Sequence, residues 1–324
     1  MENETFNFDI ISIEGLKVGP QSSIPTFIFI LLIYVFIMVS NIGLVVLISM
    51  ERSLHEPMYL LFCNMSINDV FGSTAILPRL LSEVFTPIAE RYIHYIDCAV
   101  QAFSAHFHAG TSHFVLVVMA YDRYVAICNP LRYATIMTNR MVVKLSVGAW
   151  MVPLILVAIL LGLTLRLSRC RRVITNPFCD NASLFKLSCE NLFINHIYGL
   201  ASAAFTLGSS LGSVTLTYLR IAMVCLSSKN KALNSRAVQT CATHLAVYLI
   251  MLVASFTPMI MHRHPQWAEN GKVASVMFHV VPPALNPLIY GLQCTELRNK
   301  IINVFQKKRV MDAKGAMHVP SLHK

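Results

Sequence analysis

The sequence predicts an all-α membrane protein: a seven-transmembrane helix bundle followed by a short C-terminal amphipathic helix. Its 324 residues are 55% hydrophobic and only 13% charged, whereas a typical soluble domain has about 25% charged residues. The stretch from Pro25 to Met50 contains no charged residue, and it exceeds the roughly 20 residues that a helix needs to cross a bilayer core. The lack of strand-like alternation favours helices over a membrane β-barrel.

Apolar segments place the seven helices within one domain. We expect them at residues 25–50, 58–82, 98–121, 143–165, 194–219, 238–261 and 273–292. The second and seventh segments are interrupted by polar residues or prolines, and prolines kink a helix. An N-terminal segment (1–24) precedes the seven-helix domain (25–292), and a tail (293–324) follows it. Ile301, Ile302 and Phe305 in the tail lie among basic residues with helical spacing, which is typical of a helix on the membrane surface.

Basic residues predict the orientation of the bundle. The connections near 129–144 and 227–237 and the C-terminal tail are rich in Lys and Arg, whereas the N-terminal segment is acidic. The N-terminus is therefore expected outside and the C-terminus inside. The long connection 166–193 carries four arginines and opposes this orientation, but long loops count less in the rule. The net charge of +10 then indicates attraction to anionic membrane lipids, with no nucleic-acid partner.

Cysteines and glycosylation sequons mark the expected outer side. Four cysteines fall there, where oxidation is possible: Cys98, Cys170, Cys179 and Cys189. They allow three pairings, and their spacing does not choose among them. Two N-glycosylation sequons begin at Asn3 and Asn181 on predicted outer segments.

A charge pair lies at the inner end of the third helix. The run MAYDRYVAIC at 119–128 places Asp122, Arg123 and Tyr124 directly after an apolar segment. A charged arginine at membrane depth is costly unless it is paired, and Asp122 can pair with it. A cytoplasmic partner could replace that pairing, which is typical of a switch. The alternative is an ordinary ion pair that anchors the helix end.

Several polar side chains are expected inside the bundle. Four of them are predicted to form an internal network: Asn41, Asp69, Ser112 and Asn286. Their oxygens could converge on a sodium ion, but bundle polar groups usually bond each other, so a network without an ion is favoured. Tyr290, one turn after Pro287, could reach across the inner bundle. No metal cluster and no nucleophile–base pair appears, so neither a metal centre nor an enzyme is predicted.

The outer half of the bundle offers candidate ligand contacts. The third segment, 98–121, contains no Asp or Glu, so an amine ligand would lack a counterion there. His106, His108, Met259 and Arg263 are the candidates, and a guanidinium beside imidazoles suits an anionic or strongly hydrogen-bonding ligand. The alternatives are structural hydrogen bonds for the histidines and, for Arg263, extension toward the membrane interface. His106 and His108 are two residues apart and do not face one another, which opposes a shared metal site.

These motifs give a family resemblance. The chain resembles rhodopsin-like G-protein-coupled receptors and, within them, vertebrate odorant (olfactory) receptors. The matching stretches are LHEPMY at 54–59, MAYDRYVAICNPLRY at 119–133, TCATHL at 240–245 and PPALNPLIYG at 282–291. MAYDRYVAIC is specific to odorant receptors, whereas the seventh-helix motif is shared by the wider superfamily. The form of that motif and the long outer loop resemble the fish-like class I branch.

The resemblance implies a plasma-membrane receptor that binds small odorants, carboxylates among them, in an outer cavity between helices. It implies coupling to a stimulatory, olfactory-type heterotrimeric G protein that raises cyclic AMP. In this family Arg123 would release Asp122 and meet the G protein, with Tyr218 and Tyr290 nearby. The implied disulfides are Cys98–Cys179 and Cys170–Cys189.

Two other functions compete with this interpretation. The first is a non-olfactory receptor of the same superfamily for a small acidic metabolite. The second is an ion-coupled transporter with Asp69 as its ion site, which lacks the paired broken helices of two matching halves. Within the odorant-receptor pattern, Ala254-Ser255-Phe256 replaces an aromatic element of the sixth helix, and this departure leaves the activation details open.

Overall fold

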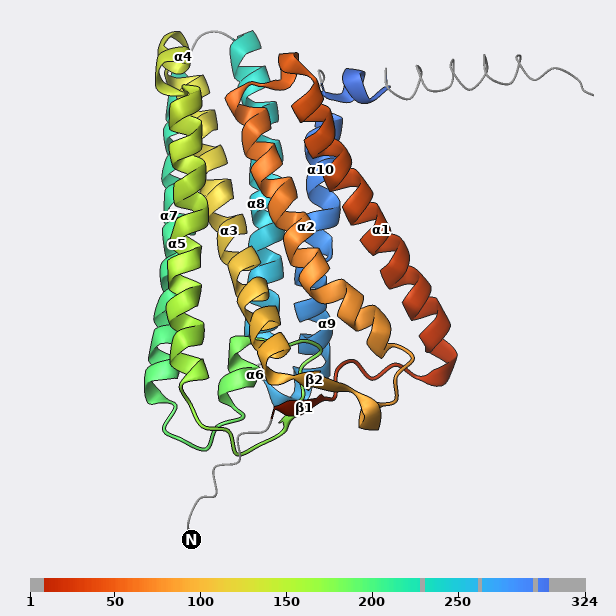
Figure 1. Ribbon diagram of the computed structural model, residues 1–324. Coiled ribbons are helices and arrows are strands. Elements are labelled where there is room, and N and C mark those ends of the chain that lie inside the picture. Colours follow the sequence, from red (N-terminus) through yellow and green to blue (C-terminus); the bar gives the residue numbers. More distant parts are fainter. Residues whose placement is uncertain (1–8, 228–230, 262–263, 294–296, 303–324) are drawn as a thin grey trace, which may run out of the picture.

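The computed structural model describes residues 9–227, 231–261, 264–293 and 297–302, which form one bundle of long helices (Figure 1). The long helices are α1 (Pro20–Met50), α2 (Pro57–Glu83), α3 (Tyr95–Cys128), α5 (Asn139–Leu165), α7 (Phe193–Ser227) and α8 (Lys231–Met261), with α9 (Ala268–Phe278) and α10 (Val281–Gln293) forming a broken seventh span. Six spans of the described chain are long and apolar enough to cross a membrane, and α3 joined to the short helices after it makes seven. The prediction of a seven-helix bundle is confirmed.

Local sequence signals set the helix boundaries. α1 and α2 each begin at a proline, whose missing N–H and fixed φ suit the first turn of a helix. Thr138 caps α5 by accepting a hydrogen bond from the Met141 N–H. α9 ends before His279, and α10 begins with the Val281-Pro282-Pro283 turn. The predicted interruption of the seventh helix therefore lies at its prolines.

The bundle exposes apolar side chains on its outside and buries several polar ones within its core. Leu32 and Val39 on α1 are more than 60% exposed, whereas Asn41 on the same helix and Asp69 on α2 are fully buried. Hydrocarbon solvates apolar side chains and leaves polar ones without partners, so the polar groups turn inward.

A small sheet closes one end of the bundle. β1 (Ile10–Ile13) pairs antiparallel with β2 (Tyr92–His94) and parallel with β3 (Val173–Ile174). The sequence analysis predicted no strand there, because strands of two to four residues are too short to show an alternating pattern. We call this the sheet end (Figure 1). α3 begins beside β2 and runs to Cys128, so Arg123 lies near its far end, and we call the end of the bundle opposite the sheet the Arg123 end.

One disulfide ties the long loop to α3 at the sheet end, and a second closes the loop on itself. Cys98 is bonded to Cys179 and Cys170 to Cys189, with Cα–Cα distances of 5.3 and 5.9 Å. This is the pairing that the family resemblance implied. In the same loop the Ser168 side chain and backbone N–H donate to Glu190, and these hydrogen bonds hold the pKa of Glu190 below its ordinary value.

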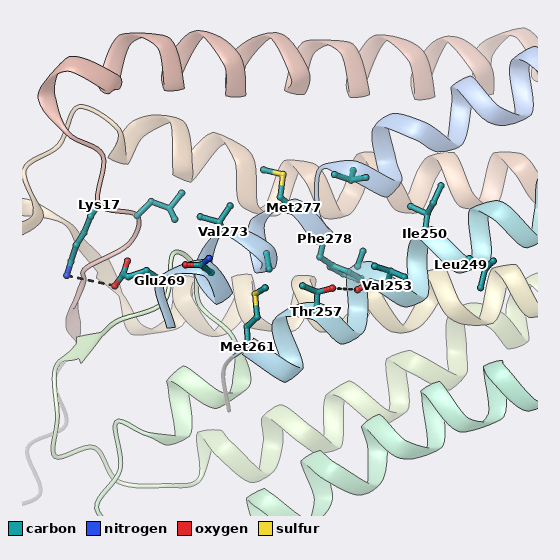
Figure 2. Close-up of a pocket in the computed structure, with 15 residues that line it drawn as sticks. Lys17, Leu249, Ile250, Val253, Thr257, Met261, Glu269, Val273, Met277 and Phe278 are labelled. Carbon is teal, nitrogen blue, oxygen red and sulfur yellow. Dashed lines mark hydrogen bonds and ion pairs between the residues drawn. The ribbon is translucent and has the colours of Figure 1, made fainter. Parts of the chain in front are cut away.

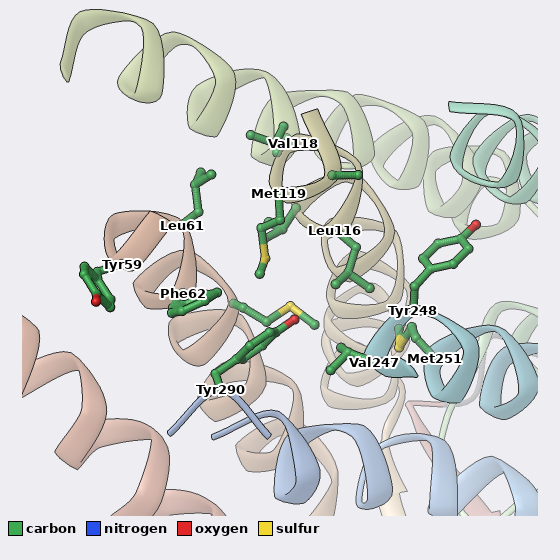
Figure 3. Packing of buried hydrophobic residues seen from close by; sticks show 14 of the residues in the cluster. Tyr59, Leu61, Phe62, Leu116, Val118, Met119, Val247, Tyr248, Met251 and Tyr290 are labelled. Atoms are coloured by element: carbon green, nitrogen blue, oxygen red, sulfur yellow. The ribbon is translucent and has the colours of Figure 1, made fainter. Parts of the chain in front are cut away.

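The largest hydrophobic cluster fills the bundle toward the Arg123 end (Figure 3). The Tyr290 ring of α10 stacks on Phe62 of α2, with ring centroids 4.3 Å apart. Leu116 of α3 and Met251 of α8 are buried in the same cluster. The cluster thereby joins α2, α3, α8 and α10 around a common centre.

A short helix follows α10 at the Arg123 end. Residues 297–302 are helical, and Leu297 is fully buried against the cluster. The Lys300 ammonium donates to the Glu51 carboxylate at 2.7 Å, which ties this helix to the end of α1. These residues agree with the predicted amphipathic helix, whose remainder, with Phe305, lies outside the described residues.

Replacing Gly72 with Ala should destabilise the protein. A Cβ at Gly72 would lie 2.2 Å from Cγ of His108, and overpacking a buried site costs about 1–3 kcal/mol. Gly43→Ala on α1 is the matched control, because a Cβ there meets no atom within 4 Å. Thermal unfolding of the purified variants should show a lowered Tm for G72A only. Equal Tm values for G72A and the wild type would contradict this packing.

Candidate functional site

The Asp122–Arg123 pair closes the Arg123 end of α3. Asp122 is fully buried, and its Oδ2 accepts a hydrogen bond from Nε of Arg123 at 3.0 Å. The Tyr133 hydroxyl donates to Oδ1 at 2.8 Å. Both oxygens of the carboxylate are therefore bound, as a charge at this depth requires. Tyr133 lies on α4 (Tyr133–Ile136), and the sequence analysis did not single it out although it ends the quoted motif.

The other predicted switch residues lie near this end. No described hydrogen bond or ion pair joins them to Arg123. Tyr218 of α7 shares a hydrogen bond of 2.7 Å with Nδ1 of His244 on α8. The Tyr290 hydroxyl is buried and has no hydrogen-bond partner among the described residues. The Tyr124 ring lies beside that of Tyr121, with centroids 6.4 Å apart. The structure thus assembles the Asp122–Arg123–Tyr133 contact and leaves Tyr218 on a separate junction between α7 and α8.

The predicted polar network joins α1, α2 and α10 in the bundle centre. Nδ2 of Asn286 donates to Oδ2 of Asp69 at 2.8 Å, which connects α10 to α2. Nδ2 of Asn41 donates to the Pro283 carbonyl at 3.0 Å, which connects α1 to α10. Asn41 therefore anchors α10 at the Pro283 carbonyl. It makes no described hydrogen bond to Asp69.

A second part of this network joins α2 to α3. Nδ2 of Asn68 donates to the Ser112 hydroxyl at 2.8 Å and to the His108 carbonyl at 3.0 Å. The Ser112 hydroxyl in turn donates to the same carbonyl at 2.9 Å. The structure corrects the assignment of His108 to the ligand cavity: its side chain is fully buried and faces Asp69 instead.

A cavity of about 620 Å³ lies between α3, α5, α7, α8 and α9, nearer the sheet end. His106 and Met259 line it, as predicted for ligand contacts. Most of its wall is apolar, including Leu160, Phe178 and Phe278. The fourth candidate, Arg263, lies outside the described residues. An apolar hollow with a few convergent polar groups is the usual form of a small-molecule site.

Hydrogen bonds fix the polar wall of this cavity. Nε2 of His106 accepts from the Asn181 N–H at 3.1 Å, so in the neutral ring Nδ1 carries the hydrogen. The Thr164 hydroxyl donates to Oδ1 of Asn181 at 2.7 Å and accepts from Nδ2 of Asn195 at 3.1 Å. Oδ1 of Asn195 is buried and has no partner within the described chain. The wall therefore offers a donor at His106, while the unpartnered Oδ1 of Asn195 is buried within the wall.

Asn181 and Asn195 line the cavity although the sequence did not point to them, and Thr164 bonds both without lining it. Asn181 lies on α6 (Asn181–Phe185), a five-residue helix in the long loop, and only the fold shows that this loop covers the cavity. The prediction that Asn181 carries a glycan is wrong in this structure. Its side chain is 5% exposed and bonded to Thr164, whereas a glycan requires a surface asparagine.

His113 connects the cavity to the helices beneath it. Its Nε2 lies 3.1 Å from the Ser255 hydroxyl of α8, and both residues line the cavity. Its Nδ1 lies 3.4 Å from the Ser210 hydroxyl of α7, which also lies 3.0 Å from the Tyr248 hydroxyl of α8. These contacts join α3, α7 and α8 at the cavity floor.

A second hollow, of about 900 Å³, runs along α8 and α9 (Figure 2). Its wall is mainly apolar, and Lys17 and Glu269, 3.9 Å apart, lie at its sheet end. Phe278 lines both this groove and the cavity described above. The groove has fewer polar groups on its wall than the cavity, so the cavity is the better candidate ligand site.

Comparisons with known proteins match these features. A family model described as "Olfactory receptor" matches residues 30–308. The chain belongs to the olfactory receptor family. It is 31% identical to human olfactory receptor 5B17 over 95% of this chain and 98% of that protein. It is 34% identical to human olfactory receptor 52N5 over 84% of this chain and 85% of that protein.

The fold is that of a rhodopsin-like receptor. The crystal structure of squid rhodopsin superposes with a TM-score of 0.73, covering 89% of this chain and 82% of that chain at 15% identity. The olfactory receptor is therefore a multi-pass plasma-membrane protein and not an enzyme. Its assignment to the class I branch stays a prediction.

Removing the second sequon should leave the glycan content of the receptor unchanged. Asn181→Gln and Ser183→Ala both abolish this sequon, and the latter keeps the Asn181 side chain. Because Asn181 is buried, neither variant should change the mobility shift that glycosidase treatment causes on gels. Asn3→Gln, which removes the predicted outer sequon, is the comparison and should abolish the shift. A shift lost in both sequon variants at 181–183 would contradict the buried placement.

Proposed function

We propose that this olfactory receptor binds a small odorant in the cavity lined by His106 and Met259 and activates a stimulatory, olfactory-type G protein that raises cyclic AMP. Its family gives it odorants as ligands and a G protein as partner. One observation carries the assignment of sites: the cavity and the Asp122–Arg123 pair lie on the same helix, α3, toward opposite ends. A ligand site and a partner site are thereby joined by one rigid element.

We further propose that the sheet end faces the outside of the cell and the Arg123 end the cytoplasm. Both disulfides lie at the sheet end, and disulfides persist in oxidising compartments. Arg132 in the turn after α3, and Arg140 and Lys144 in the first turns of α5, lie at the other end, as the positive-inside rule requires for a cytoplasmic face. Odorants then reach the cavity from outside.

The cavity wall indicates the head group of the odorant. His106 offers a donor to the cavity, so a head group that accepts a hydrogen bond suits it. Among the described lining residues there is no Lys or Arg, and Asp180 contributes a carboxylate. The prediction of a carboxylate ligand therefore rests on Arg263, which lies outside the described residues.

Activation in this proposal is a shift between two populations. The odorant binds better to a state in which the contacts of α3 with α7 and α8 have rearranged. His113, Ser210 and Ser255 make those contacts at the cavity floor, so a ligand there acts on them directly. In the active state Arg123 leaves Asp122 and contacts the G protein.

Replacing His106 with Ala should weaken the response to the odorant. A panel of small alcohols, acids, amines and amino acids, read by cyclic AMP in expressing cells, first identifies an agonist. Loss of one hydrogen bond of about 1.4 kcal/mol raises its EC50 about tenfold. His94→Ala is the matched control, because His94 is exposed on β2. An unchanged EC50 in H106A at equal surface expression would remove His106 from the ligand site.

Replacing Arg123 with Ala should abolish agonist-induced cyclic AMP, since the variant lacks the group that meets the G protein. Surface expression, measured by flow cytometry on an N-terminal tag, should remain detectable. Arg132→Ala at the same end serves as control, because Arg132 is exposed and makes no described bond to Asp122. Full signalling by R123A would refute the switch assignment.

A further inference from the structure

Two nitrogen atoms, from Asn286 and His108, face the buried Asp69 carboxylate. Its Oδ2 accepts from Nδ2 of Asn286 at 2.8 Å. Its Oδ1 has no hydrogen-bond partner among the described residues and faces Nε2 of His108 at 3.7 Å. Asp69 and His108 are both fully buried. A carboxylate at this depth needs a compensating group, and the structure supplies an amide and an imidazole.

A sodium ion at Asp69 would need a different set of neighbours. Hard cations are held by several oxygen ligands, and the sequence suggested oxygens of Asn41, Ser112 and Asn286. In the structure, Asn286 turns its amide nitrogen to the carboxylate. The Ser112 hydroxyl donates to the His108 carbonyl and accepts from Asn68. Oδ1 of Asn41 and Oδ1 of Asn68 are buried without a described partner, but neither makes a described contact with Asp69. The two groups that face the carboxylate are nitrogens, of Asn286 and His108, and nitrogens suit an anion rather than a cation.

The His108 ring is closely packed by α2 and by two aromatic rings. On one side it lies against the backbone of α2 at Gly72, where a Cβ would lie 2.2 Å from Cγ of the ring. On other sides the rings of His279 and Phe278 lie with centroids 5.2 and 5.9 Å away. These neighbours restrict movement of the imidazole toward α2 and toward the end of α9.

We propose that the imidazole of His108 takes the place of a cation beside Asp69, so that this receptor binds no sodium ion there. The His108 side chain on α3 takes the role of counter-ion to the Asp69 carboxylate on α2 and so holds the two helices together. Gly72 is the residue that makes room for it. Removing the imidazole creates the space in which a hydrated sodium ion can reach the carboxylate.

Thermal unfolding of the purified receptor in detergent tests this without any odorant. A ligand that binds only the folded state raises Tm, so Tm is compared in NaCl and in choline chloride of equal ionic strength. The wild type should unfold at the same temperature in both salts. His108→Ser, with His108→Asn as a second variant, should gain a sodium-specific rise of about 2 °C or more. The added substitution Asp69→Asn should abolish that rise.

The wild-type measurement decides the proposal even where a His108 variant fails to fold. A sodium-specific rise in wild-type Tm that Asp69→Asn removes would overturn it, because the ion would then bind beside an intact His108. Folded H108S and H108N variants without sodium dependence would also overturn it, because the imidazole would then not be what excludes the ion.

Discussion

Polar side chains buried in a membrane bundle must find their partners within the protein, because hydrocarbon provides none. α3 carries several polar groups along its length, and three of them contact the loop, α8 and α4. His106 accepts from a loop amide beside the cavity, His113 bonds a serine of α8, and Asp122 is held by an arginine and a tyrosine. The position of α3 relative to the loop, to α8 and to α4 follows from these three contacts, and both functional sites depend on that position.

The contacts of α3 with α7 and α8 also give a physical route between the two sites. His113 and Ser255 line the cavity, so a ligand touches the same groups that join the helices. Nearer the Arg123 end, Tyr218 and His244 join α7 to α8. In the proposed mechanism, a rearrangement of α7 and α8 at the cavity floor would reach the Arg123 end through this α7–α8 contact, without any contact between the ligand and that end.

The sequence predicted what local patterns encode. Long apolar segments gave the seven helices, and the costly charge of Arg123 indicated its pairing with Asp122. The pairing of Asn195 with Thr164, the burial of Asn181 and the short strands could not be predicted, because they depend on how a loop folds back over the bundle. His108 was misplaced for a related reason: helical spacing gives the face of a residue, but only the packing of α2 at Gly72 shows which neighbour it meets.

The orientation of the bundle decides whether the Asp122–Arg123 pair faces the cytoplasm, where the G protein is. Two exposed positions report on it: Val173 on β3 at the sheet end and Leu131 in the turn after α3, where it is 99% exposed. Each is replaced by Cys and labelled on intact cells with a membrane-impermeant maleimide, with the unmodified receptor as background. We expect labelling of V173C on intact cells and of L131C only after permeabilisation. The reverse pattern would contradict the account, because the Asp122–Arg123 pair would then face away from the G protein.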